Sequence, residues 1–321
     1  MHRTLAAAVI MVGVYASTDA QGQQYPSRPI RIVVPFAPGG AVDIVARMLS
    51  LRLGESLQQN VVVDNRAGAG GTIGTDIVAK ARADGHTLLV GSMGVAVNAV
   101  LYPKLPYDTL KDLAPITTLA EQPNIIVAHP SVPVKSVRDL IALAKVKPGQ
   151  ISYGSGGVGS NSHFATVLFL MMANVDMLHV PYKGLGPAIG ELVGGQVQMA
   201  VSNVSTALPH VKSGRLRLLA VTTMKRFPLF PDTPTVSESG VPGYESSGWY
   251  ALWTPAGTPR AIVAKLNARV TEILRSMPMK EQLAAQGLEP IPTTPEAFEK
   301  QLRVEIEKWG KVVKATGAKP E

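Results

Sequence analysis

The sequence predicts an α/β protein with two lobes, each a mainly parallel sheet flanked by helices. Short β-branched runs alternate with glycine-rich turns and helical patterns, the order expected of a parallel sheet with covered faces. The chain has 321 residues, 46% of them hydrophobic, which favours two lobes over a single core. Two apolar stretches, near Ile125 and Tyr250, are predicted to cross between the lobes. The first lobe should then comprise residues 25–122 and 251–321, and the second lobe residues 123–250.

The first third of the chain shows the alternation most clearly. Ile30–Val34 is short, β-branched and bounded by prolines, so it is predicted to be a buried strand. The same reasoning predicts helices at 43–57 and 73–80 and strands at 61–64 and 88–90.

The remainder continues this alternation through the second lobe and back to the first. Residues 116–128 form the first crossing strand, followed by strands at 151–153, 179–181, 197–201 and 216–221 and helices at 137–144, 162–173 and 187–193. A proline-rich linker covers 227–244, and the second crossing strand covers 249–253. Helices at 260–277, 279–286 and 295–313 close the chain; Thr294 and Pro295 form a typical helix start.

Four glycine-rich turns each follow an apolar run and precede a helical pattern. They cover residues 35–40, 68–72, 91–94 and 154–160. The first turn of a helix has N–H groups without intrahelical partners and a partial positive charge. Glycine allows a ligand to approach this backbone closely. The turns therefore predict a pocket for a small anion, lined mainly by backbone.

The N-terminus has the features of a secretory signal at residues 1–20. Met1-His2-Arg3 is basic, residues 5–15 are apolar, and small residues follow up to Ala20. Cleavage is expected after Ala20 or Ala16, and the apolar stretch is too short to span a bilayer. No later segment has the length of a spanning helix, so the mature protein is expected to be exported and soluble. The chain has no cysteine, which excludes disulfides and thiol catalysis.

Charge and histidine spacing argue against two further classes of function. The net charge is +8, but the Lys and Arg residues are scattered and aromatic residues make up only 5%, so nucleic-acid binding is not expected. The six histidines show no metal-binding spacing and no acidic cluster accompanies them, so no metal site is expected.

The segment Gly154-x-Gly156-x-x-Gly159 matches a dinucleotide-binding fingerprint and follows a strand. Asp176 is near the expected acidic position, but it precedes the next strand instead of ending it. The turn also carries more hydroxyl and amide side chains than a pyrophosphate turn needs. Binding of a small anion by the same backbone is the better interpretation, and no cofactor is expected.

Ser160 and His163 are spaced so that they could face one another at a helix start, as a nucleophile and its base. No Gly-x-Ser-x-Gly elbow occurs in the chain, and no third residue is evident. The favoured interpretation is that Ser160 or Asn161 caps the helix. Asp43 is similarly expected to cap the first helix, with a direct ligand role as the minority interpretation.

Several other polar residues are candidates because of their position. Ser92 belongs to the third glycine turn, and Tyr182 follows the strand at 179–181. Ser202 and Asn203 end the strand at 197–201, and the ends of such strands face the crevice in open α/β sheets.

Six motifs in order resemble the periplasmic substrate-binding receptors of tripartite tricarboxylate transporters, the Bug receptor family. The matching segments are 35–43 (PFAPGGAVD), 64–74 (DNRAGAGGTIG), 153–163 (YGSGGVGSNSH), 179–184 (HVPYKG), 207–217 (ALPHVKSGRLR) and 231–236 (PDTPTV). The similarity extends from about residue 25 to 313. It implies a two-lobed periplasmic binding protein fold, type II-like, with the ligand in the cleft between the lobes.

The resemblance also implies the site, because family receptors hold a carboxylate through backbone groups and ordered water at the glycine turns of both lobes. One wall would contain Phe36, Gly39, Gly40, Asp43 and Thr72; the other would contain Ser155, Gly156, Ser160, Asn161 and His163. Many relatives carry Asp where this chain has Ser202. The ligand is therefore expected to be a simple mono- or dicarboxylate, aliphatic or aromatic, instead of an amino acid.

The function expected on this basis is that of a receptor without catalytic activity. It would capture a carboxylate-bearing metabolite by cleft closure and deliver it to membrane transporter subunits, and a monomer is the default for this architecture. Two alternatives stay open at this point. One is a cofactor-free hydrolase or isomerase that uses Ser160 and His163; the other is a sensory receptor for a membrane kinase.

Overall fold

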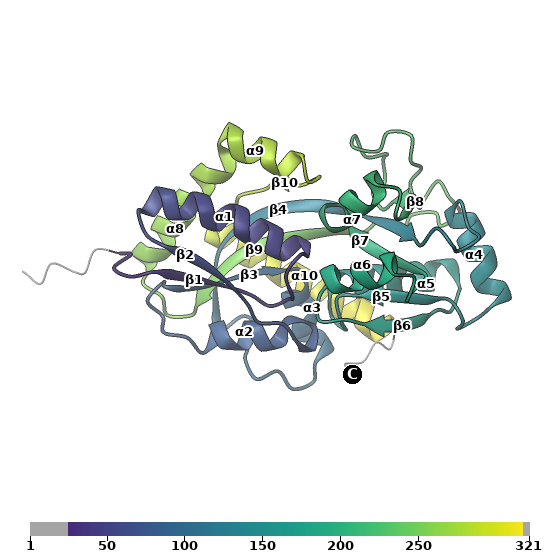
Figure 1. Ribbon diagram of the computed structural model, residues 1–321. Helices are drawn as coiled ribbons and strands as arrows, with labels where there is room; N and C mark the ends of the chain where they lie inside the picture. Colours follow the sequence, from purple (N-terminus) through teal and green to yellow (C-terminus); the bar gives the residue numbers. More distant parts are fainter. Residues whose placement is uncertain (1–24, 317–321) are drawn as a thin grey trace, which may run out of the picture.

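In the computed structural model, which describes residues 25–316, the strands form one continuous, curled sheet (Figure 1). Its order is β2-β1-β3-β9-β4-β7-β5-β6, and β8 and β10 pair with β4 outside this path. The strands are β1 (Ile30–Val34), β2 (Val61–Asn65), β3 (Thr87–Ser92), β4 (Leu113–Ala128), β5 (Ser152–Ser155), β6 (Leu178–Pro181), β7 (Met199–Asn203), β8 (Arg217–Val221), β9 (Ser247–Pro255) and β10 (Glu289–Pro290).

At one end of the sheet, β1 lies between β2 and β3 and pairs with both in parallel. The helices α1 (Ala41–Leu57), α8 (Arg260–Arg275) and α9 (Met277–Ala284) bury their apolar residues against one face. The short η1 (Ala69–Gly71), α2 (Thr72–Ala79), α3 (Gly94–Leu101) and α10 (Pro295–Thr316) lie toward the other face (Figure 1).

At the other end, β5 lies between β6 and β7 and again pairs with both in parallel. Helices α4 (Val137–Val146) and α5 (Asn161–Ala173) share a buried cluster with one face. Helices α6 (Leu185–Val193) and α7 (Val204–Lys212) share a cluster with the opposite face. Each end of the sheet is therefore a layered α/β unit with its own core.

The long strand β4 joins the two ends. It pairs antiparallel with β9 as far as Pro123, and with β7 and β8 from Asn124 onward. The parallel pairing predicted for each end is therefore confirmed, while the middle of the sheet, where β9 and β4 run, is antiparallel. The predicted lobe boundaries stay a prediction.

The strands and helices predicted from the sequence are confirmed with small shifts at their ends, and each of the four glycine turns leads into a helix. Helix α7 and the short β10 were not predicted. Helix α7 contains Pro209 at its sixth position, together with Ser205 and Thr206, and these residues do not favour a helix interior. The predicted signal sequence lies outside the described residues.

An aromatic cluster ties α10 to the rest of the molecule. Trp309 of α10 meets the ring of Phe164 edge-on at 5.5 Å between centroids, and Phe298 packs against Trp253 of β9 at 5.0 Å. Phe164 and Trp253 are fully buried. The C-terminal helix therefore packs against residues from both ends of the sheet.

We expect Phe164→Ala to destabilise the protein by about 3–5 kcal/mol, because it removes a fully buried ring and leaves a cavity beside Trp309. Urea unfolding followed by far-UV circular dichroism measures this change. Met172→Ala on the same helix is the control: this side chain is 37% exposed, and its truncation should cost about 1 kcal/mol or less. An equal decrease in the free energy of unfolding for the two variants would contradict the buried position of the Phe164 ring beside Trp309.

Candidate functional site

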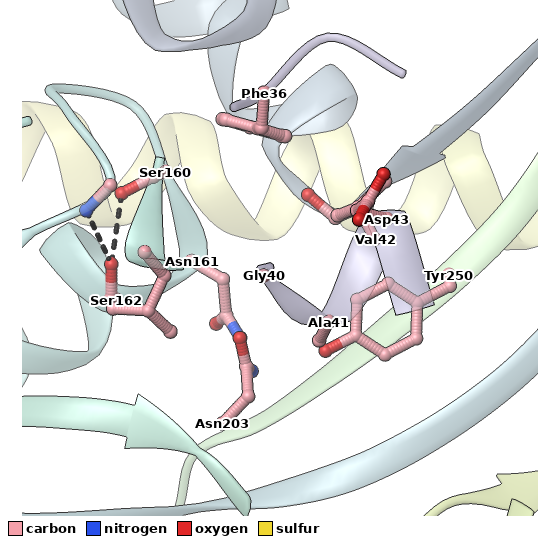
Figure 2. Close-up of a pocket in the computed structure, with 13 residues that line it drawn as sticks. Phe36, Gly40, Ala41, Val42, Asp43, Ser160, Asn161, Ser162, Asn203 and Tyr250 are labelled. Carbon is pink, nitrogen blue, oxygen red and sulfur yellow. Dashed lines mark hydrogen bonds between the residues drawn. The ribbon is translucent and has the colours of Figure 1, made fainter. Parts of the chain in front are cut away.

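A pocket with a cavity volume of about 30 Å³ lies where the carboxyl ends of strands from both ends of the sheet meet (Figure 2). Three of the four glycine turns contribute to it, and the second turn does not. Its lining residues are Phe36, Gly40, Ala41, Val42, Asp43, Ser92, Gly156, Ser160, Asn161, Ser162, Leu185, Asn203 and Tyr250.

Four helices begin at this pocket: α1, α5, α6 and α7. The N-caps of α1, α6 and α7, which are Gly40, Gly184 and Asn203, provide no side-chain cap. The first N–H groups of these helices therefore have no intrahelical acceptor and no acceptor from the N-cap side chain, although Gln122 Oε1 accepts from the Ser205 N–H of α7 at 3.0 Å. None of the described lining residues is Lys or Arg. The positive potential of the pocket thus comes from backbone N–H groups and helix dipoles.

Asp43 braces the first glycine turn. It is 4% exposed, and its carboxylate accepts hydrogen bonds from the Gly39 amide (3.1 Å), Arg47 (2.9 Å) and Asn65 (3.0 Å). Burial alone raises the pKa of Asp43, but the bonds from Arg47, Gly39 and Asn65 outweigh it and hold the pKa below its usual value. Both carboxylate oxygens are therefore engaged within the protein.

Ser160 and Ser162 shape the fourth turn. The Ser160 hydroxyl caps α5 by accepting a bond from the backbone N–H of His163 (3.3 Å), and it lies 3.1 Å from the Ser162 hydroxyl. Ser162 in turn accepts a bond from the Gly156 amide at 2.9 Å, as Figure 2 shows. These hydroxyls hold the turn in place, as the capping interpretation predicts.

Two stacked imidazoles lie behind this turn. His163 stacks on His179 at 4.5 Å between centroids, and the Nε2 atom of His179 contacts the Ser155 hydroxyl at 2.6 Å. Burial, together with the neighbouring His179, lowers the pKa of His163 to about 3. Burial lowers the pKa of His179 to about 4. Both rings are therefore neutral at pH 7, and His163 contacts Ser160 through its backbone.

Three asparagine amides meet at the floor of the pocket. Asn124 of β4 accepts on Oδ1 from the Nδ2 of Asn203 (2.8 Å) and from the Nδ2 of Asn161 (3.3 Å). Its own Nδ2 donates to the Ser246 hydroxyl at 3.0 Å. Figure 2 shows the tips of Asn161 and Asn203 close together. We call these three residues the asparagine triad.

Tyr250 joins the pocket from β9. Its hydroxyl oxygen accepts a bond from Gln122 Nε2 at 2.6 Å, while the same nitrogen contacts Ser205 at 3.1 Å. Burial raises the pKa of Tyr250, so the hydroxyl keeps its proton. Because the oxygen already accepts, the phenolic hydrogen can be donated to a ligand.

The structure brings eight of the predicted site residues to the pocket and leaves six outside its lining. The eight are Phe36, Gly40, Asp43, Ser92, Gly156, Ser160, Asn161 and Asn203. Those outside are Gly39, Thr72, Ser155, His163, Tyr182 and Ser202. Gly39 braces Asp43, the hydroxyl of Thr72 bonds Ala69, and that of Ser202 bonds the Asn203 carbonyl. Which of the fourteen contact a ligand stays a prediction.

Five lining residues were not predicted: Ala41, Val42, Ser162, Leu185 and Tyr250. Ala41, Val42 and Ser162 lie in the first turns of α1 and α5. The glycine turns that precede these helices therefore already indicated their position. In the sequence, Leu185 and Tyr250 have the character of ordinary core residues. Only the three-dimensional packing places them at the pocket.

A second pocket, with a cavity volume of about 460 Å³, adjoins the first and shares Phe36 and Gly156 with it. Its other lining residues include the second glycine turn at 68–71, Tyr102, Tyr182 and Lys183. The predicted site residue Tyr182 therefore faces this outer space, beside a lysine that is exposed.

The two walls are in direct contact around these pockets. The Ala37 amide of the first wall donates to the Lys183 carbonyl of the second wall at 2.9 Å. Gly70 has φ +59°, and a Cβ there would lie 1.9 Å from the Val158 carbonyl oxygen. A glycine is therefore required for this close approach, and the cleft is closed.

The family model described as "Tripartite tricarboxylate transporter family receptor" matches residues 45–318. The chain belongs to this family. BugT from Bordetella pertussis is 41% identical over 316 residues, which cover 96% of this chain and 97% of BugT. These findings confirm the receptor family that the six motifs indicated.

Two solved structures show the same fold. The R. palustris protein Rpa4515 with adipate has a TM-score of 0.89 and 38% identity, covering 92% of this chain and all of that chain. The periplasmic binding protein BugD has a TM-score of 0.89 and 34% identity over 92% of this chain and 100% of its own. The receptor therefore has the two-lobed periplasmic binding protein fold that the sequence predicted.

Within residues 25–316, no group of His, Asp and Glu side chains is arranged to hold a metal ion. None of the helices in the same range combines the length and the apolar character of a membrane span. The pocket therefore offers a ligand backbone N–H groups, hydroxyls and amides.

The stacked imidazoles predict a loss of stability in mild acid. In the unfolded chain a histidine has its ordinary pKa of 6.5, while the folded values are about 3 for His163 and about 4 for His179. Between these values the unfolded chain binds more protons, so stability is full above about pH 6.5 and decreases as the pH falls toward 4. We expect a smaller decrease in His163→Gln, measured as the melting temperature between pH 7 and pH 4.

The control is His129→Gln, which replaces a histidine whose Nδ1 atom bonds the hydroxyl and the backbone N–H of Ser131. It should retain the pH slope of the unmodified protein. Identical slopes for His163→Gln and the unmodified protein would contradict the prediction.

Proposed function

We propose that this receptor captures a small carboxylate-bearing metabolite in the pocket between its lobes and delivers it to a tripartite tricarboxylate-type membrane transporter. The observation that carries the proposal is the convergence of four helix N-termini on one pocket without a lining cation. Such N-termini bind carboxylates through backbone N–H groups and the helix dipole.

The chemistry of the pocket supports a carboxylate over an amino acid. Asp43 is its acidic lining residue, and both carboxylate oxygens are engaged with Gly39, Arg47 and Asn65. This chain has Ser202 at the position where many relatives carry Asp. The Ser202 side chain is fully buried and does not line the pocket. A ligand ammonium would therefore find no free anionic partner in the pocket.

The dimensions support a ligand of modest size. The inner cavity of about 30 Å³ has room for the carboxylate end, and the adjoining cavity of about 460 Å³ can receive the rest of a longer acid. Adipate, the six-carbon diacid bound to the related Rpa4515, has this elongated shape. We infer a simple mono- or dicarboxylate for this chain.

Capture would take place by closure about the crossing strands. We infer a hinge near residues 122–125 and 248–252, where β4 exchanges its pairing with β9 for pairing with β7 and β8. Ligand contacts to both walls favour the closed state, because those contacts are complete only there.

The proposal includes no catalytic role, and several contacts support this. The Ser160 hydroxyl is occupied as a helix cap, and the pKa of His163 near 3 makes that ring a poor base at pH 7. A hydrolase or isomerase that uses Ser160 would lose turnover in Ser160→Ala, whereas the receptor would show at most weaker binding. A sensory output to a membrane kinase would use the same capture step.

The cellular setting belongs to the same proposal. We infer export to the periplasm with cleavage near Ala20, action as a monomer, and no nucleic-acid partner. A related structure is a periplasmic binding protein, which supports this setting.

The experiment that tests the function is native mass spectrometry of the freshly purified protein, followed by denaturing release of any bound molecule. A carboxylate at one per chain is the expected result. A released nucleotide or flavin would overturn the proposal. If the chain is empty, a thermal-shift screen of mono- and dicarboxylates against amino acids decides: ligand at 100 times its Kd should stabilise the protein by about 2.7 kcal/mol. Stabilisation by amino acids alone would contradict the proposed ligand class.

Ala41→Pro tests the backbone donors directly. Ala41 is the first residue of α1, where proline is tolerated, and the preceding Gly40 is extended at ψ 167°, as a residue before proline requires. The substitution removes one N–H group from the pocket. We expect the Kd of the carboxylate to rise by about 10- to 100-fold, since a hydrogen bond to a charged group contributes about 1.5–3 kcal/mol.

The matched control is Arg260→Pro at the first position of α8, which makes the same backbone change outside the pocket lining. Isothermal titration calorimetry of both variants should show weaker binding only for Ala41→Pro. Unchanged affinity in Ala41→Pro, with the fold intact by circular dichroism, would show that this N–H does not bind the ligand.

A further inference from the structure

One polar atom at the pocket has no partner. The Oδ1 atom of Asn161 is buried and accepts no hydrogen bond from the described residues, although the side chain lines the pocket and is 7% exposed. An amide oxygen held away from water without a donor costs about 1–3 kcal/mol. A bound molecule in the pocket is the natural source of that donor.

The orientation of the Asn161 amide follows from the asparagine triad. Asn124 Oδ1 accepts from Asn203 at 2.8 Å and from Asn161 at 3.3 Å, so both of its lone pairs are used. Reversing Asn161 alone would place two amide oxygens 3.3 Å apart. Within this network Asn161 therefore presents a hydrogen-bond acceptor.

The other groups at the pocket do not satisfy this acceptor. The Ser160 hydroxyl is paired with the His163 N–H and Ser162, and Ser162 with the Gly156 N–H. The Tyr250 hydroxyl oxygen accepts from Gln122, and its hydrogen forms no bond to Asn161 Oδ1. The helix N–H groups suit a carboxylate, which supplies acceptors only. A second, neutral donor on the ligand is what the site still lacks.

We propose that this receptor selects carboxylates that also carry a hydroxyl or amide N–H, which donates to Asn161 Oδ1. The inference rests on the proposed carboxylate function and makes it more specific. A hydroxyl fits better than an ammonium group, because the acceptor is a neutral amide and the neighbouring Asp43 carboxylate is already engaged.

Calorimetric titration of the unmodified receptor with three series of acids tests the proposal. The series are butanoate with its 2-, 3- and 4-hydroxy forms, succinate with D- and L-malate, and benzoate with its three monohydroxy isomers. These series move one hydroxyl along otherwise matched scaffolds. We expect at least one hydroxylated acid to bind about tenfold more tightly than its parent, the effect of one buried donor–acceptor pair.

Asn161→Ala locates the effect. For the hydroxylated acid that binds most selectively and its parent acid, this variant should bring the ratio of the two Kd values close to one. The main cause should be weaker binding of the hydroxylated acid. Asn60→Ala, at an exposed asparagine, should leave the ratio unchanged. The comparison within the unmodified protein stands even if the Asn161 variant does not fold.

The outcomes separate the two proposals. If every parent acid binds as tightly as its hydroxylated forms, the proposed selection is overturned while the carboxylate function stands. This result is expected if all three amides of the asparagine triad are reversed, so that Asn161 presents its NH₂ group to the ligand. If no acid in any series binds, the proposed function fails and the selection fails with it. A ratio that persists in Asn161→Ala would assign the donor to another partner and overturn the inference.

Discussion

The backbone N–H groups that begin four helices are the constraint on which the site depends. A helix start needs an acceptor for its first donors, and at α1, α6 and α7 the N-cap supplies none. Gln122 Oε1 takes the Ser205 N–H of α7, while the acidic and hydroxyl side chains beside α1 are directed to other partners. Asp43 turns to Gly39 and Arg47, and the Ser160 hydroxyl serves the His163 N–H of its own helix. The donors are left to an anion, and glycines keep the approach open.

The same arrangement explains why the pocket is tied to the long strand β4. Gln122 and Asn124 flank the position at which β4 changes pairing partners, and each side chain contacts a lining residue. Gln122 bonds Tyr250, and Asn124 bonds both Asn161 and Asn203. A ligand that touches these lining residues therefore contacts side chains held directly by the crossing strand. If the lobes move as we propose, these buried hydrogen bonds connect the crossing strand to the pocket.

Much of this fold could be predicted from the sequence because its signals are local. β-branched runs, glycine turns and Thr294-Pro295 each specify a short segment independently of distant residues. Helix α7 was missed because its own residues disfavour a helix, and burial of Val204, Ala207 and Leu208 decides its structure. The antiparallel centre of the sheet was missed for a related reason: pairing of β9 with β3 and β4 joins residues more than a hundred positions apart.

The candidate site was predicted less completely, since neighbours in sequence often point in opposite directions. Ser202 and Asn203 adjoin in β7, yet only Asn203 lines the pocket, because side chains alternate along a strand. His163 lies two positions after Asn161 on α5 and faces His179 behind the turn. Leu185 and Tyr250 carry no sequence signal for binding, and they reach the pocket through the placement of α6 and β9.

A division of labour between backbone and side chains follows from this geometry. The helix N–H groups recognise any carboxylate, because they respond to charge and to accepting oxygens alone. Discrimination among carboxylates must then come from the few side chains whose hydrogen-bonding capacity is not consumed within the protein. Asp43, Ser160 and Ser162 hold the turns, whereas Tyr250 keeps a phenolic hydrogen that it can donate. Asn161 retains an unused acceptor, and we expect the outer space beside Tyr182 and Lys183 to limit how far a longer ligand can extend. Related receptors can therefore share the glycine turns and the fold while differing in the acid that they bind.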